Sequence, residues 1–284
     1  MIRFGAHSSL WAGGWSREDA EVSVREAARW GLEVVEIALL EPDKIDVAHS
    51  RALFSRYGVA PTASLVLPIE CEATRHPEAA TAFLIGALEV AHALGSNTLS
   101  GVPYATLGSL TRSPPTEAEY EAIARALKPV ARRAADYGMT IGIEPCNRYE
   151  THLVNTAAQA RALIERIDEP ALMIHLDTYH CNIEEKSFAA ALAAGAGRVR
   201  YVHLSESDRG APGSGNVDWR GLMIALKAAD FSGDLVIESF VNMMPSLAGA
   251  LSVWRPVARD VEEVLSIGVP LMKSLARATG LAIH

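Results

Sequence analysis

The sequence lacks the cysteine patterns that mark disulfide-rich secreted domains and zinc-binding modules. Its 284 residues contain three cysteines, Cys71, Cys146 and Cys181, and none of them forms a CxxC pair. The amino terminus runs directly into a strand-like segment and shows no secretory hydrophobic region. An odd cysteine count without such a region is typical of a reducing compartment, so we expect a cytoplasmic protein.

Basic clusters and long apolar runs are also missing. The chain has 26 Lys and Arg against 34 Asp and Glu, a formal net charge of −8, which is unfavourable for binding nucleic acid. No uncharged apolar run reaches the ~18 residues that a membrane helix needs. Neither GxxxxGK[ST] nor GxGxxG occurs, so nucleotide binding has no support. We expect neither a nucleic-acid partner nor a membrane partner.

Short apolar runs alternate with helical patterns along the whole chain, and hydrophobic residues make up 49% of it. Neither a linker nor a change of composition interrupts this alternation. Eight strand–helix units in ~250 residues predict a closed parallel (β/α)8 TIM barrel, here one α/β domain over residues 1–284. A doubly wound open sheet is the alternative on pattern alone. The expected strands are 3–8, 34–39, 61–67, 97–102, 139–144, 172–177, 199–204 and 235–239, with a last helical region at about 253–280, broken near 268–270.

Four of these strands end on a side chain that can bind a metal: Glu144, Asp177, His203 and Glu238. Parallel barrel strands point their carboxyl ends at one mouth, so we expect these four side chains to meet there. Any one of them, taken alone, is equally well explained as a solvated acid at a strand end. Together, two Glu, one Asp and one His suit a divalent cation that accepts oxygen and nitrogen, so we expect Mn²⁺ or Co²⁺, with Mg²⁺ as an alternative.

Further polar and aromatic side chains lie close to these strand ends. His175 precedes Asp177 by one inward step and is either a partner of a metal ligand or a core histidine. We interpret Cys146 and Cys181 as small packing residues. Trp11 follows the first strand and lies either at the mouth, against a substrate, or in the core. The glycine-containing loop 208–216 follows the seventh strand, where barrels often bind phosphate, so a sugar phosphate is a possible ligand.

The motifs around the strand ends resemble those of the ketose 3-epimerases within the xylose-isomerase-like barrels. They are EPCNRYE at 144–150, LDTYHCNIEE at 176–185, HLSESDRG at 203–210 and IESF at 237–240. The likeness extends to GAHS at 5–8 and to Trp254 and Arg255. In place of the family's frequent Thr-Phe-His-Met-Asn, this chain has TYHCN at 178–182. The segments 66–72 and 103–107, which would face the far end of a sugar, match less well.

This resemblance implies an isomerase that epimerises free ketoses at C3, of the D-tagatose/D-sorbose, D-fructose/D-psicose or L-ribulose/L-xylulose type. It implies a metal on the four residues named above, and a homodimer or homotetramer. It also implies substrate contacts from Glu150, His180 and Arg209, and we add His7 and Trp11 as further expected contacts. Preference among ketoses stays open at this stage.

Inversion at C3 requires one proton-transfer group on each face of the carbon, and two metal-bound Glu on different strands meet that requirement. We therefore expect Glu144 and Glu238 to be catalytic. Three alternatives use the same barrel: an aldose–ketose or sugar-phosphate isomerase, a phosphodiesterase resembling endonuclease IV, and a sugar-binding barrel without activity. The phosphodiesterase would need more His ligands and a basic surface, and binding alone needs no base on two faces.

Overall fold

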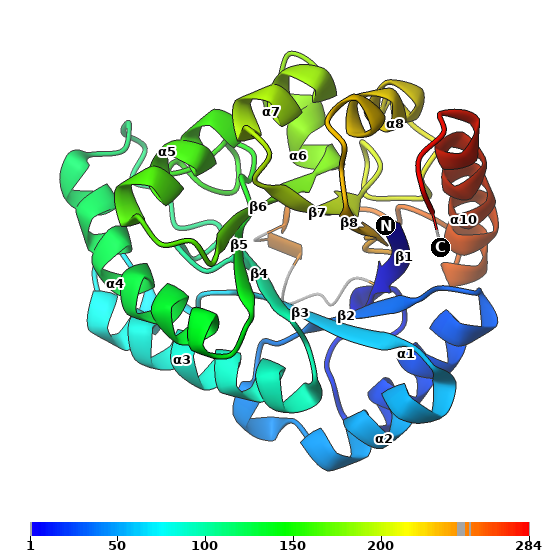
Figure 1. Ribbon diagram of the computed structural model, residues 1–284, viewed down its shortest axis with the longest axis horizontal. Coiled ribbons are helices and arrows are strands. Elements are labelled where there is room, and N and C mark those ends of the chain that lie inside the picture. The colour runs from blue at the N-terminus through cyan, green and yellow to red at the C-terminus, as the bar shows by residue number, and fades with distance from the viewer. Residues whose placement is uncertain (1, 243–247, 250, 284) are drawn as a thin grey trace.

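The computed structural model describes residues 2–242, 248–249 and 251–283, and its strands form one closed parallel barrel (Figure 1). The strands pair in sequence order, and β8 closes the ring against β1. The predicted TIM barrel is therefore confirmed, and the open sheet is excluded. The strands are β1 Ile2–His7, β2 Val34–Ala38, β3 Ala60–Val66, β4 Thr98–Val102, β5 Thr140–Ile143, β6 Leu172–Asp177, β7 Val199–Leu204 and β8 Gly233–Ile237.

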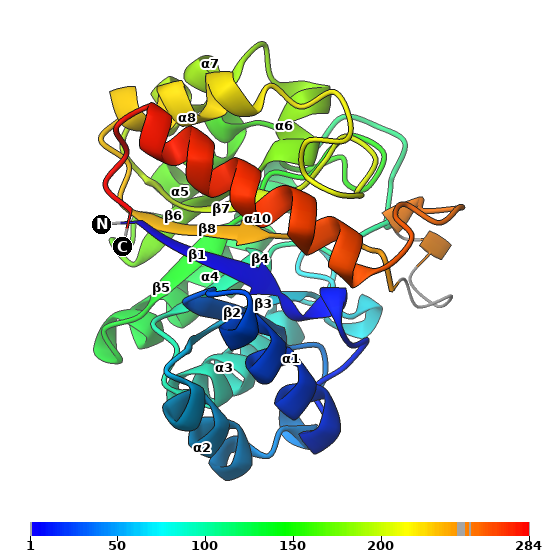
Figure 2. The same cartoon turned by 90° about the vertical axis from the view of Figure 1, so that its right-hand side faces the viewer.

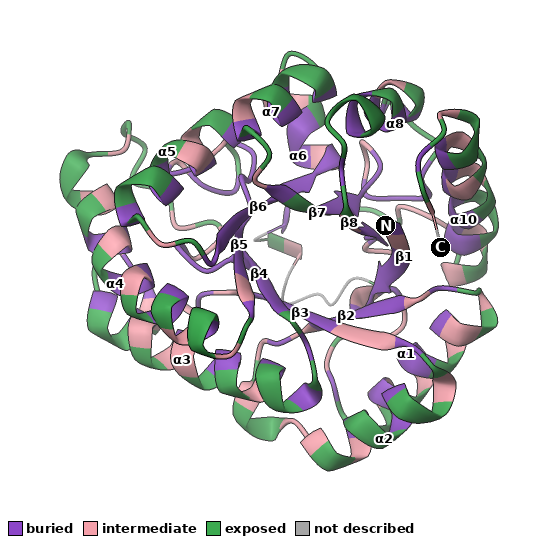
Figure 3. Cartoon of the chain, in the orientation of Figure 1, coloured by how far each residue is buried: buried purple, intermediate pink, exposed green. Residues whose placement is uncertain are grey.

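Helices surround the ring and bury the face that they turn toward it (Figure 3). Among the residues that the structure describes, no helix has the length and apolar character needed to cross a membrane. The helices are α1 Arg17–Arg29, α2 Val47–Tyr57, α3 Pro77–Leu94, α4 Glu117–Asp136, α5 Ala157–Ile167, α6 Thr178–Glu184, α7 Phe188–Gly195, α8 Trp219–Ala228 and α10 Val261–Ala278, with short 3₁₀ turns η1 Ser8–Leu10, η2 Pro42–Lys44 and η3 Ile69–Cys71.

Local sequence signals explain where several helices begin and end. Thr116 caps α4 by accepting a hydrogen bond from the amide of Glu119, whose carboxylate bonds back to the Thr116 amide. Helices α2 and α3 end at Gly58 and Gly95, both in the left-handed conformation that glycine adopts without steric strain. These short-range signals fix the length of each unit and so the position at which the next strand starts.

The carboxyl ends of all strands point to one end of the barrel, while the first and last described residues, Ile2 and Ile283, pair at the opposite end (Figures 1 and 2). A small apolar cluster of Val34, Met173, Tyr201 and Val236 lies inside the ring. Polar side chains occupy the interior nearer to the carboxyl ends. The barrel therefore has an apolar floor and a polar mouth.

Two elements differ from the prediction. Helix α6 begins directly after β6, because the Asp177 side chain accepts hydrogen bonds from the amides of Tyr179 and His180 and so caps a helix there. The last helix begins at Val261, where Asp260 caps it, and residues 254–260 are not helical. It also continues through Pro270 without a break.

Candidate metal and active site

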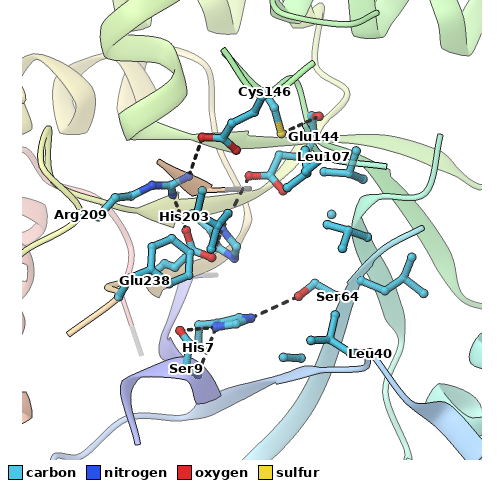
Figure 4. A pocket seen from close by; sticks show the side chains of 18 of the residues that line it. His7, Ser9, Leu40, Ser64, Leu107, Glu144, Cys146, His203, Arg209 and Glu238 are labelled. Atoms are coloured by element: carbon cyan, nitrogen blue, oxygen red, sulfur yellow. Dashed lines mark hydrogen bonds and ion pairs between the residues drawn. The ribbon is translucent and has the colours of Figure 1, made fainter. Parts of the chain in front are cut away.

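Residues at the ends of β5, β7 and β8 line one side of a cavity of about 300 Å³ (Figure 4), and Asp177 at the end of β6 lies next to them. Glu144 and Glu238 directly follow β5 and β8, Asp177 is the last residue of β6, and His203 lies one residue before the end of β7. All four side chains are at least nine-tenths buried. The opposite wall of the cavity is largely apolar and includes Leu40, Val66 and Leu107.

Nδ1 of His203 is the centre of this arrangement. It lies 3.5 Å from Glu238 Oε1, 3.7 Å from Asp177 Oδ2 and 3.9 Å from Glu144 Oε1. Although buried, it has no hydrogen-bond partner among the described residues. Asp177, His203 and Glu238 offer donor atoms that all lie within 4.8 Å of one another.

These residues fit a divalent cation. Bonds of about 2.0–2.2 Å from one ion to nitrogen and oxygen ligands place neighbouring ligand atoms about 3–4 Å apart, which matches the spacing around His203 Nδ1. Buried carboxylates are unfavourable unless they are paired or bound to a metal. An ion at this point would bind both the unpaired Nδ1 of His203 and the three carboxylates around it.

The two oxygens of Asp177 have separate tasks. Oδ1 accepts the amides of Tyr179 at 2.6 Å and His180 at 3.3 Å, which starts α6. Oδ2 faces Arg209 Nη1 at 3.0 Å and the nitrogen of His203. The helix amides therefore hold the carboxylate in an orientation that leaves one oxygen directed into the site.

The guanidinium of Arg209 is the positively charged group that contacts the carboxylates of the site. Its Nη1 donates to Glu238 Oε2 at 2.6 Å and to Asp177 Oδ2 at 3.0 Å, while Nη2 lies 3.6 Å from Glu150 Oε1. The side chain packs between the rings of Tyr179 and Phe240, 4.0 and 4.9 Å from their centroids. Its backbone has φ 66°, in the left-handed region that a non-glycine residue seldom adopts, and such strain concentrates at functional sites.

Burial and neighbouring charge shift the pKa values of the site. Burial raises the pKa of Glu144 well above its usual range, and the carboxylates of Asp177 and Glu238 add to this effect. Burial would also raise the pKa of Asp177, but Arg209, His180 and His203 hold it well below its usual range. In the absence of a metal, a negative charge is therefore stabilised on Asp177 and not on Glu144.

His180 presents an N–H group to the cavity. Its Nδ1 accepts the backbone amide of Asn147 at 3.1 Å and the side-chain amide of Asn147 at 2.9 Å. Burial lowers the pKa of His180 to about 3, so the ring is neutral and its one proton is on Nε2. That nitrogen lies 3.8 Å from Glu144 Oε1 and 4.0 Å from Glu150 Oε2, and Arg209 Nη2, itself a donor, lies 3.3 Å from it.

Glu150 lies beside His180 and is held by the side-chain amide of Asn147 at 2.8 Å. Burial raises the pKa of Glu150 to about 7, although Arg209 and Asn147 oppose the shift. The carboxyl group therefore changes charge near neutral pH. Glu150, His180 and Arg209, the residues expected to contact substrate, all line the cavity.

Of the two residues predicted near the first strand, the structure brings one to the cavity. His7 lines it and directs Nε2 toward Ser64 Oγ at 3.5 Å, while its Nδ1 accepts the amide of Ser9. Trp11 packs against the hydrophobic core and is not among the described residues that line the cavity.

His175 lies below Asp177, as the strand alternation predicts, and the two nearby cysteines pack in the core. His175 Nδ1 is 3.8 Å from Glu144 Oε2, below the expected ligands, and both ring nitrogens lack a partner among the described residues. Cys146 and Cys181 are buried, unpaired and part of the hydrophobic core. A ligand set of Glu144, Cys146 and His180 is also close enough for a metal, but the proton on His180 Nε2 makes this set a poor one.

Sequence reasoning missed two buried acids that organise the site. Glu36, in the middle of β2, accepts a hydrogen bond from His203 Nε2 at 2.7 Å. Glu206, in the loop after β7, accepts the amides of Ser207, Gly213 and Val217 at 2.8, 2.8 and 3.1 Å. A charged residue inside the apolar run of β2 was the available signal for Glu36, and Glu206 had none beyond its place at the mouth.

Comparison with known proteins identifies the class. The family model described as a xylose isomerase-like TIM barrel matches residues 24–256. The chain therefore belongs to the xylose isomerase-like TIM barrel family.

Particular relatives within this family are ketose 3-epimerases. The chain is 37% identical over 278 residues to an L-ribulose 3-epimerase from Methylomonas sp. (strain DH-1), covering 96% of this chain and 97% of that protein. It is 35% identical over 269 residues to a ketose 3-epimerase from Arthrobacter globiformis, covering 93% of each. The crystal structure of a Methylomonas sp. D-allulose 3-epimerase in complex with D-allulose superposes with a TM-score of 0.92 at 35% identity, over 96% of both chains. The predicted resemblance and the predicted isomerase class are confirmed.

Proposed function

We propose that the protein is a divalent-metal-dependent 3-epimerase of free ketoses. The unpaired Nδ1 of His203, with one oxygen of each of three carboxylates within 3.9 Å, is the observation that carries this proposal. The ketose 3-epimerases among its relatives support the reaction type. Glu144, Asp177, His203 and Glu238 would hold the cation.

The bound cation would act as a Lewis acid on the carbonyl next to C3, which makes the C3 proton easier to remove. Mn²⁺ or Co²⁺ suits this mixture of carboxylate and imidazole ligands, and Mg²⁺ is the alternative. The remaining work falls to side chains of this chain.

Glu144 and Glu238 would move the proton at C3. They come from strands three places apart in the ring, so they approach a substrate from different sides. One carboxylate takes the proton from one face of C3 and the other returns a proton to the opposite face, which inverts the centre. The reverse reaction exchanges their roles.

Glu150, His180 and Arg209 would bind and orient the substrate. Nε2–H of His180 is a donor for a sugar oxygen, and the Glu150 carboxyl group beside it can accept a hydrogen bond from a hydroxyl. Arg209 keeps Glu238 in place through the 2.6 Å contact and covers the site together with Phe240. The apolar wall opposite these groups shields the reacting carbon from water.

Charge at the site favours free sugars over sugar phosphates. Among the described residues that line the cavity, Arg209 is the one Lys or Arg side chain, and Asp177, Glu150 and Glu238 already surround it. A phosphate dianion would enter a cavity whose carboxylates outnumber its fixed cations.

The loop after β7 leads to the same conclusion. Its amides could have formed a cradle for phosphate, but those of Ser207, Gly213 and Val217 donate to Glu206, as does Trp219 Nε1 at 3.0 Å. The carboxylate of Glu206 thus occupies the anion position of this loop. We therefore do not propose a sugar-phosphate ligand at this loop.

A substrate panel tests the proposal. The purified protein, freed of metal and then supplied with Mn²⁺, is incubated with D-fructose, D-tagatose, L-ribulose and their phosphates, and the products are separated by chromatography. We expect C3 epimers from the free ketoses. Products formed mainly from the phosphates, or aldoses in place of C3 epimers, would overturn the assignment.

Several finer statements remain predictions. They are the identity of the metal, the homodimer or homotetramer, the cytoplasmic location and the single-domain organisation of residues 1–284. Metal analysis of protein purified from its own cells and light scattering test the first two.

A further inference from the structure

A further buried carboxylate, that of Glu36, lies next to the proposed metal site on the far side of His203. Glu36 lies inside the barrel on β2 and is fully buried. Its Oε2 accepts hydrogen bonds from His203 Nε2 at 2.7 Å and from the Tyr201 hydroxyl at 2.8 Å. The Thr62 hydroxyl lies 2.8 Å from that of Tyr201 and completes the chain of contacts. Strands β2, β3 and β7 thus meet across the interior through one polar network.

Stability does not explain a carboxylate at this position. An ionised group inside a barrel loses its hydration, and hydrophobic side chains of similar volume fill such a place equally well or better. Glu36 is not even fully satisfied, because its Oε1 has no hydrogen-bond partner among the described residues. On that side, His7 Nε2 lies 4.0 Å from Oε1, beyond hydrogen-bonding distance. The contact with His203 is therefore the feature that needs a functional reason.

That reason lies in the two nitrogens of His203. Nδ1 faces oxygens of Glu144, Asp177 and Glu238, and these would attract a proton to Nδ1, where it would occupy the place of a metal. Glu36 offers a closer acceptor on the opposite side of the ring, at Nε2. The hydrogen bond to Glu36 keeps a proton on Nε2 both in the neutral ring and in the doubly protonated ring. Nδ1 is therefore the nitrogen that can bind the cation.

We propose that Glu36 is a positioning residue that fixes the ring orientation and the Nε2–H form of His203, so that Nδ1 is available to a divalent cation. The inference rests on the proposed metal site. Outer partners of this kind typically contribute 10–100-fold to metal affinity, although they never touch the ion. The Tyr201 hydroxyl, which itself contacts Thr62, donates a hydrogen bond to Glu36. Side chains from β2, β3 and β7 therefore fix the position of the His203 ring.

The first experiment measures Mn²⁺ affinity by titration calorimetry for the unaltered chain and for Glu36→Ala and Glu36→Gln. Glu36→Ala should bind Mn²⁺ about 10–100-fold more weakly. Glu36→Gln keeps a carbonyl oxygen that can accept from His203 Nε2, so it should recover most of this loss. Asp234→Asn is the matched control, because Asp234 is also a buried barrel carboxylate, paired with Arg3 at 2.7 Å and without a contact to His203. It should lower the melting temperature but leave Mn²⁺ affinity unchanged.

The second experiment takes its result from the unaltered chain and uses one variant only to assign the signal. In the metal-free, ¹⁵N-histidine-labelled chain, a slowly exchanging ring N–H bound to Glu36 should appear far downfield, and His203→Asn identifies it by its loss. Absence of that signal from the unaltered chain would overturn the proposal, as would unchanged Mn²⁺ affinity in folded Glu36→Ala. An equal loss of affinity in Asp234→Asn would overturn it too. A failure of the unaltered chain to bind any divalent metal would instead refute the proposed metal site itself.

Discussion

The two proposed proton-transfer residues have different surroundings, and replacing each by Gln should reveal the difference. Glu238 accepts a hydrogen bond from Arg209 Nη1 at 2.6 Å and one from Ser205 Oγ at 3.1 Å. The carboxylate of Glu144 makes no hydrogen bond with any residue that the structure describes, and burial raises its pKa. Gln is nearly isosteric with Glu and keeps one oxygen for a metal, but it is a very poor base.

In the metal-free protein, the two changes should affect stability unequally. Glu238→Gln weakens a buried hydrogen bond to a cation, which contributes about 1.5–3 kcal/mol to the free energy of unfolding. At about 2 °C per kcal/mol for a chain of this size, its melting temperature should fall by about 3–6 °C. Glu144→Gln removes a carboxylate whose charge burial disfavours, so its melting temperature should stay the same or rise.

In catalysis, the two variants should resemble each other. With Mn²⁺ bound, each should lose about 10²–10⁴-fold in kcat, the usual contribution of general acid–base catalysis. The variant that lacks the base for a given epimer should lose C3–H exchange of that epimer and retain slow exchange of the other. Asp177→Asn should differ from both, losing Mn²⁺ first and activity as a consequence.

Differential scanning calorimetry of the metal-free variants and single-turnover kinetics of the loaded ones measure these effects. Near-normal turnover by either Glu→Gln variant with metal bound would refute the assignment of two bases, and Glu150 or His180 would then have to move that proton. Equal drops in the melting temperatures of Glu144→Gln and Glu238→Gln would refute the inference that only Glu238 is stabilised by hydrogen bonds.

Two other predictions concern stability. A ligand that binds only the folded state stabilises it, so Mn²⁺ at 100 times its dissociation constant should add about 2.7 kcal/mol, seen as a higher melting temperature that a chelator reverses. No change in melting temperature at saturating Mn²⁺ would argue against the metal site. Burial would raise the pKa of Glu206, but hydrogen bonds from Ser207, Gly213 and Trp219 lower it. A lowered carboxyl pKa stabilises the fold above the ordinary pKa, and this contribution is lost as the pH falls through the lowered value. Glu206→Gln should therefore melt well below the unaltered chain at pH 7 and approach it in acid, whereas a difference independent of pH would contradict this account.

The barrel and the meeting of four strand-end side chains could be predicted because both depend on short-range patterns. Each strand end is marked by an apolar run that closes on Glu144, Asp177, His203 or Glu238, and parallel strands bring such ends to one mouth. The alternation of side chains along β6 also placed His175 below Asp177. These inferences need no knowledge of how distant strands face each other.

The missed features depend on contacts across the barrel or on geometry at a single residue. Glu36 on β2 meets His203 on β7 only once the ring has closed, and 167 positions separate them in the chain. The position of Trp11 against the core likewise depends on packing between elements. Helix α6 was missed because Asp177 acts both as a helix cap and as a candidate ligand, and the sequence reading considered only the second role.

Deuterium incorporation tests the central claim most directly. The Mn²⁺-loaded protein is incubated in D₂O with a free ketose that it converts, and the position of deuterium in the product is read by NMR. The account predicts deuterium at C3, none at C1, and no incorporation after the metal has been removed and shown to be absent. Deuterium confined to C1, or C3 exchange that persists in metal-free protein, would contradict it.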